Sequence, residues 1–220
     1  LEFRRVLFRS AALYSNSTTS YNTAIGYQAM YSHTGGTSMG IGAQALYSNT
    51  TGDDNTAVGS YRPMYSNTTG AANSAFGRAS LLSNTTGSYN TAIGRDALQA
   101  NTTASNNTAV GYQAAYTNAT GSRITAVGFQ AGYTSAVVSA NAFNTYLGYQ
   151  AGYYDATGIH NTFLGYASGP NTTSSASGSY NTAIGSLAGI GMTSGSNNTS
   201  LGYQSLYSNT TANANTAVGY

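Results

Sequence analysis

The pentapeptide Asn22-Thr23-Ala24-Ile25-Gly26 decides the fold of this 220-residue chain, because close copies of it recur to the last residues. Successive glycines of these copies are 16 to 20 residues apart, most often 17. The glycines are Gly26, Gly42, Gly59, Gly77, Gly94, Gly111, Gly128, Gly148, Gly165, Gly185, Gly202 and Gly219. A short fixed period means that one small unit is stacked many times, each unit contacting its neighbours. We therefore expect one elongated repeat domain over residues 11–220, with a repeated surface instead of a single active site.

The composition is unusual for a folded protein. Charged residues make up 5% of the chain, against roughly a quarter in typical soluble domains. Aromatic residues nevertheless reach 12%, and the apolar residues keep a fixed register, which argues against disorder. The chain has no cysteine, so neither a disulfide framework nor a thiolate metal site is expected.

The formal charge of +2 comes from the first ten residues. Beyond them, the chain has four arginines and four aspartates, so the net charge of the repeats is zero. We therefore expect no nucleic-acid partner. No stretch of about 18 apolar residues exists, so we expect no membrane insertion by this segment.

The two ends differ from the repeats. Residues 1–10, LEFRRVLFRS, match no copy of the repeat, and we expect a non-native or unstructured leader. A truncated signal or anchor is the alternative, although the stretch has neither an initiator Met nor a small-residue cleavage site. The last pentapeptide ends at Gly219, in mid-repeat, which indicates a fragment of a longer array.

Aligning the copies on their glycines gives each column a structural meaning. The residue before the glycine is apolar in all twelve copies and mostly β-branched, which predicts a strand residue facing a core. Two positions earlier, on the same face of a strand, stands Thr or Ser in every copy except Met39. The residue between them is usually Ala, which predicts close approach of another backbone. Tyr146 and Phe163 are the exceptions.

The segment after the glycine has its own pattern. Tyr27-Gln28-Ala29 and its copies are often followed by a second apolar residue and then by a turn such as residues 47–52, YSNTTG. Asn and Gly tolerate left-handed backbone in turns, and the density of β-branched residues, Gly and Asn disfavours helix. Each unit therefore reads as strand, bend, short second strand and turn. The two longest units predict small loop insertions at 135–142 and 171–179.

These columns predict an all-β chain, a parallel β-solenoid or β-roll of about twelve coils of about 17 residues. Stacked at about 4.8 Å, twelve coils would span roughly 55 Å. Each coil offers only two or three core side chains, little burial against the entropy of its backbone. Association with identical chains would close a second apolar face, so we expect an oligomer.

The phrase at residues 22–29, NTAIGYQA, and its copies resemble the head repeats of YadA-like trimeric autotransporter adhesins. Similar arrays occur in tail-fibre-like surface proteins that end in a trimeric chaperone domain. The resemblance covers about residues 21–220 and implies a left-handed parallel β-roll in a homotrimer. The family's unit is usually shorter, near 14 or 15 residues. The unit of this chain is longer because its turn contains the Asn-Thr-Thr-Gly extension.

No catalytic, cofactor-binding or metal-binding residue is expected. His33 and His160 share no column and are interpreted as solvated loop residues. Asp53 and Asp54 could form an acid/base dyad or a cation site, but adjacent strand residues point to opposite faces, so a turn is favoured. Serines lack a positioned His and acid, and calcium-binding β-rolls need recurring Asp. A monomeric left-handed β-helix, as in hexapeptide acyltransferases, stays an alternative. Only one hexapeptide in three of this chain matches the repeat of that fold, which counts against it.

Three surface columns invite functional interpretations. The Asn-Thr-Thr sequons suggest glycosylation, although a turn already explains Asn there, and they lie at Asn49, Asn67, Asn84, Asn101 and Asn209. Tyrosine columns favour either adhesion or packing between coils and chains, and they comprise Tyr27, Tyr112, Tyr149, Tyr166, Tyr203, and Tyr31, Tyr47, Tyr65, Tyr116, Tyr133, Tyr153, Tyr207. A threonine column could match an ice lattice, and it comprises Thr23, Thr56, Thr91, Thr108, Thr125, Thr145, Thr162, Thr182, Thr199 and Thr216.

The leading hypothesis is a non-enzymatic structural and adhesive head segment of a surface fibre. The resemblance implies an extracellular place, on a bacterial cell surface attached to the outer membrane or on a virion. Its partners would be host or matrix proteins or glycans. Ice binding is the alternative, although outward Thr-x-Thr pairs are not systematic.

Overall fold

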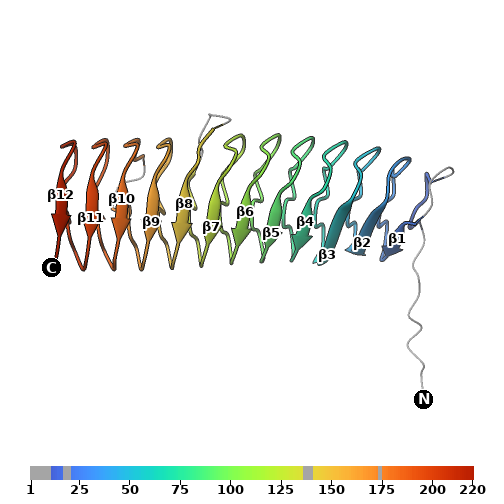
Figure 1. Cartoon of the computed structure of the whole chain (residues 1–220). Helices are drawn as coiled ribbons and strands as arrows, with labels where there is room; N and C mark the ends of the chain where they lie inside the picture. The colour runs from blue at the N-terminus through green and yellow to red at the C-terminus, as the bar shows by residue number, and fades with distance from the viewer. Residues whose placement is uncertain (1–10, 17–20, 136–140, 173–174) are drawn as a thin grey trace, which may run out of the picture.

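The computed structural model describes residues 11–16, 21–135, 141–172 and 175–220. One parallel sheet contains twelve strands in chain order, and Figure 1 shows them as a row of arrows pointing the same way. The strands are β1 (Thr23–Ile25), β2 (Ser38–Ala43), β3 (Asn55–Tyr61), β4 (Ser74–Phe76), β5 (Thr91–Ile93), β6 (Thr108–Val110), β7 (Thr125–Val127), β8 (Thr145–Leu147), β9 (Thr162–Leu164), β10 (Thr182–Ile184), β11 (Thr199–Leu201) and β12 (Thr216–Val218). The described part contains no helix. This confirms the all-β parallel β-solenoid, whereas the leader expected at 1–10 lies outside the described residues.

Neighbouring coils place like residues on like residues. Between β5 and β6, Thr91 pairs with Thr108 and Ile93 with Val110. Each column of the sequence alignment therefore becomes a ladder along the stack, as the fixed period predicts.

The orientation predicted for the strands is wrong. The middle residue of the strand points inward, as at the fully buried Ala92, while Ile93 beside it is 41% exposed. A shift of one residue moves every side chain of a strand to the other face. The interior accepts mainly small strand side chains because Leu98 and its counterparts already fill it from the opposite wall. The apolar residue before each glycine consequently lies on the outer face, beside the threonine.

The predicted second strand is also absent from most of the described coils, and only β2 and β3 continue past their glycines, where Ala43 pairs with Tyr61. After Gly94 (φ 131°), the left-handed region returns at Asp96 (φ 59°) and Leu98 (φ 49°). Coil-to-coil hydrogen bonds continue through this segment, since Asp96 N donates to Arg78 O at 2.9 Å and Leu98 N to Ala114 O at 3.0 Å. Alternating bonds to the preceding and following coils satisfy the backbone without strand geometry.

The core is a narrow column of facing side chains. Four of the described coils combine a strand Ala with Leu or Met from the opposite wall, such as Ala92 and Leu98, both fully buried. Two coils reverse the sizes, because Tyr146 and Phe163 occupy the strand position and glycines occupy the opposite wall. A Cβ added to Gly152 would lie 2.3 Å from the Tyr146 ring. In these two coils the ring fills the space that a Leu or Met of the opposite wall fills elsewhere.

Buried asparagines form two further ladders. Asn67 Nδ2 donates to Asn49 Oδ1 at 2.7 Å and to Gly70 O at 2.9 Å, and Asn84 repeats both bonds one coil later. In the second ladder, Asn73 Oδ1 accepts from the backbone N of the next asparagine. Asn67 and Asn84 do not adopt left-handed backbone. Their role is therefore to satisfy buried polar groups.

The second predicted insertion is confirmed by the hydrogen-bond register. Asn171 N donates to Ile190 O, and Ser177 N donates to Thr193 O. The step from Asn171 to Ser177 covers six residues, whereas the step between their partners, Ile190 and Thr193, covers three. Three extra residues therefore lie between Asn171 and Ser177. The insertion expected at 135–142 lies largely outside the described residues.

Candidate functional site

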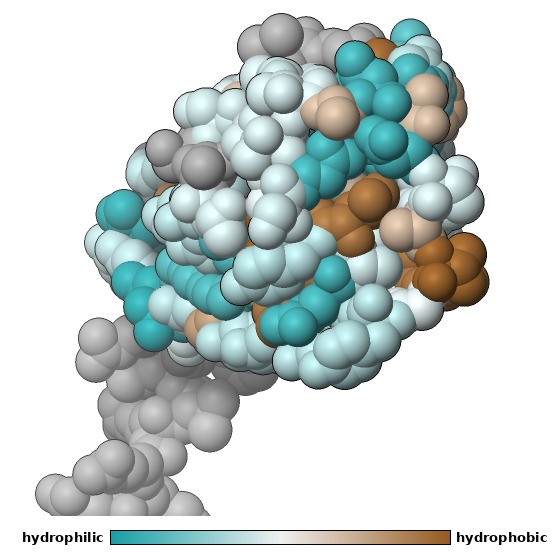
Figure 2. Space-filling view, turned by 90° about the vertical axis from the view of Figure 1, so that its left-hand side faces the viewer, coloured by the Kyte–Doolittle hydropathy of each residue, from teal (hydrophilic) through white to brown (hydrophobic). Residues whose placement is uncertain are grey.

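The outer face of the sheet carries two parallel ladders, one of threonine and one of aliphatic residues. We call the second the aliphatic ladder. Its members are Ile25, Ile41, Val58, Phe76, Ile93, Val110, Val127, Leu147, Leu164, Ile184, Leu201 and Val218. Seven of them are 39–72% exposed. Figure 2, which looks along the stack from the β12 end, shows hydrophobic surface on one flank of the outline and in its middle.

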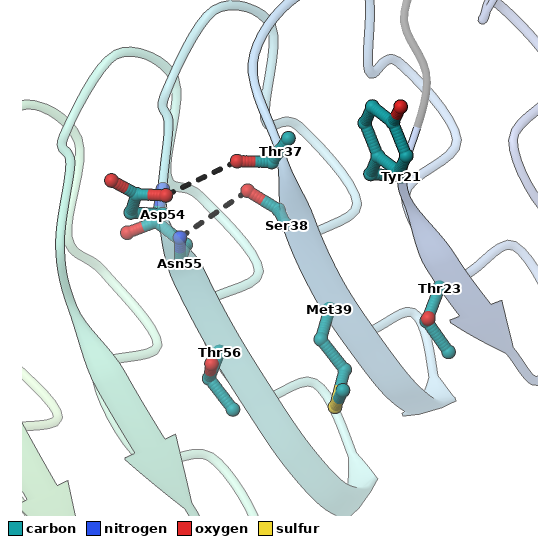
Figure 3. A pocket seen from close by; sticks show the side chains of 8 residues that line it. All are labelled: Tyr21, Thr23, Thr37, Ser38, Met39, Asp54, Asn55 and Thr56. Atoms are coloured by element: carbon teal, nitrogen blue, oxygen red, sulfur yellow. Dashed lines mark hydrogen bonds between the residues drawn. The ribbon is translucent and has the colours of Figure 1, made fainter.

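A shallow hollow of about 230 Å³ lies on this face near the first three strands. Its lining is Tyr21, Thr23, Thr37, Ser38, Met39, Asp54, Asn55 and Thr56. Figure 3 shows Met39 and the threonines along one part of the hollow, with Thr37 bonded to Asp54. Met39 is the one member of its column that is neither Thr nor Ser, so the hollow interrupts the threonine ladder.

Asp53 and Asp54 precede β3, which confirms a turn position for the pair. Both carboxylates accept from the Thr37 hydroxyl, at 3.0 and 3.1 Å, and Asp53 also accepts from Thr37 N. Hydrogen bonds from Thr37, first from its backbone N–H, lower the pKa of Asp53. A carboxylate with a lowered pKa is a poor general base or acid near neutral pH. The pair therefore anchors one coil on the next.

The interpretation of His33 as a solvated loop residue is wrong. His33 is fully buried and occupies the first position of the asparagine ladder, where Nδ1 meets Asn49 Nδ2 at 3.0 Å and Nε2 meets Gly36 O at 3.1 Å. Burial lowers its pKa. His160 is exposed, as expected, and stacks between Phe143 and Tyr180.

Asp155 is fully buried in the interior of its coil. It stands where other coils have asparagine, with Oδ2 accepting from Tyr146 Oη and Asn161 Nδ2, both at 2.9 Å, and Oδ1 accepting from Gly158 N at 3.2 Å. Burial raises the pKa of Asp155 to about 6, although these three donors oppose the shift. Burial and the Asp155 charge also raise the pKa of Tyr146 well above its usual value. All polar atoms point into the core, so the pair has no route to a substrate.

The tyrosine columns form stacked ladders. Rings lie 4.9–5.2 Å apart along Tyr14, Tyr31, Tyr47 and Tyr65, and 4.9–5.1 Å apart along Tyr116, Tyr133 and Tyr153. A third ladder joins Tyr112, Phe129, Tyr149 and Tyr166. Packing between coils thus accounts for the columns, while exposed rings such as Tyr149 and Tyr166 still present surface to a partner.

Four of the five sequons have a structural explanation. Asn49, Asn67, Asn84 and Asn101 are fully buried, and Asn209 is half-buried. A glycosyltransferase cannot reach a buried side chain in the folded protein, so these four asparagines serve the core.

No family model, curated protein or solved structure matches this chain. The described residues contain no group of three His, Cys, Asp or Glu side chains arranged to hold a metal ion. In the same part of the chain, no helix is long and apolar enough to cross a membrane. What the geometry offers to a partner is therefore the set of outer ladders.

Two outer ladders were not singled out from the sequence. Glutamines bond side chain to side chain, as Gln130 Nε2 does to Gln113 Oε1 at 2.9 Å. The stack of Phe143, His160 and Tyr180 is the other. Both follow the glycine register at 17 and 20 residues, so complete alignment of the outward columns would have found them.

Proposed function

We propose that this chain is a non-enzymatic structural and adhesive head segment of a cell-surface or virion fibre, assembled from identical copies. The aliphatic ladder supports the proposal, because it forms an uninterrupted apolar line on the outside of the sheet. Contiguous exposed apolar surface of this kind marks interaction sites in soluble proteins. The resemblance of the repeats to YadA-like heads supports three copies and a place outside the cell as parts of this proposal.

The ladder can supply enough free energy for association. Complete burial of an Ile, Leu, Val or Phe side chain contributes about 1.5–3 kcal/mol, and the exposed members have about two fifths of their surface left to bury. Each of these seven members thus adds about 0.6–1.2 kcal/mol, or about 4–8 kcal/mol together, and the five less exposed members add less each. Loss of translational and rotational freedom costs about 4–15 kcal/mol. A partner that covers only part of the ladder would gain too little.

Light scattering on the purified chain at micromolar concentration tests this proposal. We expect oligomers for the wild type, and dissociation for Ile93→Asp, which buries a charge in the contact. Thr86→Asp is the matched control, since Thr86 is exposed in a turn of the same coil. A stable wild-type monomer, or equal behaviour of both variants, would refute assembly through this face.

Ice binding is a second proposal, and the outward threonine ladder supports it. Thr91, Thr108 and Thr125 repeat at the coil spacing on the outer face of a regular parallel sheet. The residue two positions on is aliphatic, not threonine. Ice binding needs this face open, whereas fibre assembly closes it. Thermal hysteresis together with a monomeric state would support the ice-binding function. Absence of thermal hysteresis would eliminate that function.

A further inference from the structure

Three ladders follow one another on the segment after the glycine corner. We call them together the aromatic–amide strip. Its residues are Tyr112, Phe129, Tyr149 and Tyr166, then Gln113, Gln130 and Gln150, then Tyr116, Tyr133 and Tyr153. Assembly through the aliphatic ladder would leave these side chains available.

The first ladder presents ring surface, not only ring edges. Centroids from Tyr112 through Phe129 and Tyr149 to Tyr166 are 5.3, 5.0 and 5.4 Å apart, with planes within 21° of parallel. Carbon atoms in contact lie about 3.5–4.0 Å apart, so rings with this centroid separation must be slipped sideways by about 3–4 Å. Each ring then exposes part of its face, in agreement with exposures of 39% for Phe129, 45% for Tyr149 and 55% for Tyr166.

The amide ladder supplies hydrogen-bonding capacity between the rings. Gln130 Nε2 donates to Gln113 Oε1 at 2.9 Å, and Gln150 Nε2 donates to Gln130 Oε1 at 3.0 Å. A primary amide has two hydrogens and two acceptor lone pairs, and the ladder uses one of each at Gln130. The remaining hydrogen and lone pair match the hydroxyl groups of a sugar.

The three ladders are close enough to contact one ligand. Arg62 takes the glutamine position in its own coil, where its guanidinium bonds Gln44 and lies 4.7 Å from the centre of the Tyr65 ring. The glutamine column therefore borders the column of Tyr65 and Tyr133. Arg62 also lies 4.8 Å from the centre of the Tyr61 ring, and Tyr61 pairs with Ala43 in the column of Tyr112 and Phe129.

We propose that the aromatic–amide strip binds an uncharged, extended β-1,4-linked polysaccharide that runs along the stack. This inference rests on the proposed adhesive function and names its ligand class. Coils rise about 4.8 Å each, close to the length of one pyranose unit. Successive units of a β-1,4 chain are turned over relative to each other, so every second coil presents its Tyr and Gln side chains to a sugar in the same orientation. The apolar C–H face of a sugar packs on the slipped rings, and its hydroxyls bond the amides and phenols.

Charge complementarity selects a neutral chain over an anionic one. None of the ten strip residues carries a charged side chain. The nearest arginine recorded against the strip is Arg95, whose guanidinium lies 5.7 Å from the centre of the terminal Tyr112 ring. Sulfated or carboxylated glycans need arrays of basic residues, which the strip does not offer.

Co-sedimentation of the whole purified chain with insoluble cellulose and with chitin tests the proposal, with cellohexaose titration by calorimetry as the soluble probe. The test variant is Phe129→Ala/Tyr149→Ala, because Ala43 already occupies this column. Tyr89→Ala is the control, since Tyr89 is exposed outside the strip and Ala72 occupies its column with the same backbone. Gln130→Ala is a second test variant, because Ala79 holds that position at φ 54°.

We expect wild-type binding to cellulose or chitin, at least a tenfold loss in both test variants, and a change below twofold in the control. Circular dichroism and light scattering on the same preparations report fold and assembly. An oligomeric wild type that binds neither polymer would overturn this inference and leave the fibre proposal standing. Undiminished binding by the test variants would remove the strip from the site. Binding confined to heparin or to matrix protein would overturn the ligand class.

Discussion

Replacing Asp155 with asparagine should stabilise the protein near neutral pH and remove a pH dependence that the wild type has. The carboxyl group is fully buried in the asparagine ladder. An asparagine there can accept from Tyr146 Oη and Asn161 Nδ2 as the carboxylate does. Its Nδ2 can donate to Gly158 O, as Asn118 Nδ2 does to Gly121 O at 2.8 Å. The substitution therefore removes a charge and keeps the bonds from Tyr146 and Asn161, while the bond from Gly158 N to the carboxylate is exchanged for one from Nδ2 to Gly158 O.

The sign and size follow from proton linkage. The pKa of Asp155 rises from 3.8 to about 6 in the fold, so the folded state binds its proton more tightly than the unfolded chain. This contribution is fully present below about pH 4, is lost as pH rises toward 6, and is constant above. The difference of about 2 pKa units corresponds to about 3 kcal/mol. Asp155→Asn should gain up to this amount over the wild type at pH 7 relative to pH 4.

Guanidinium denaturation of both proteins, followed by circular dichroism from pH 4 to pH 8, measures the effect. His33 has a lowered pKa, so its contribution runs the other way, but it is present in both proteins and cancels in the difference. Asp53→Asn is the control, because the pKa of Asp53 is lowered and its carboxylate loses stabilising bonds as pH falls. If the free energy of unfolding of the wild type and of Asp155→Asn changed with pH in the same way, the raised pKa of the Asp155 carboxyl would be refuted.

Two further predictions concern the core. Gly152→Ala should lower the free energy of unfolding by about 2–4 kcal/mol, because its Cβ would meet the Tyr146 ring; a double-mutant cycle with Tyr146→Ala should show a coupling above about 1 kcal/mol, and additive effects would contradict the size exchange. Asn84→Ala should cost about 2–4 kcal/mol, because it leaves Asn67 Oδ1 and Gly87 O without their donor, whereas Thr86→Ala in the same turn should change the denaturation midpoint little.

The stacking of coils was predictable because a glycine period of about 17 has few structural solutions. Which side chains of each strand point inward was not predictable, because β-branched Ile93 resembles a core residue and Ala92 is common both inside and outside proteins. A usable signal lay in the exchange of sizes: Tyr146 replaces Ala where glycines replace Leu98-type residues across the core. Only an inward strand residue requires such compensation.

Local backbone geometry was the least predictable part. Left-handed backbone at Leu46 and Leu98 contradicts residue preference, and coil-to-coil bonding maintains it. The burial of His33 could have been found, since it stands seven residues after its glycine, as Asn49 does. The residue type of His33 alone suggests a solvated side chain, whereas its position in the column of Asn49 indicates a core residue.

The variation between coils separates folding requirements from functional ones. The column after the glycine is largely exposed and varies in polarity, with Tyr27, Ala43, Tyr61 and Arg78 in successive coils. The aliphatic ladder is also largely on the outside, yet it is apolar in every copy. Isolated exposed apolar residues need no explanation, but an unbroken line of them does. Since the core inside the coil does not use these side chains, their repetition supports the proposal that another surface covers them, and a second copy with the same period would offer one in register at every coil.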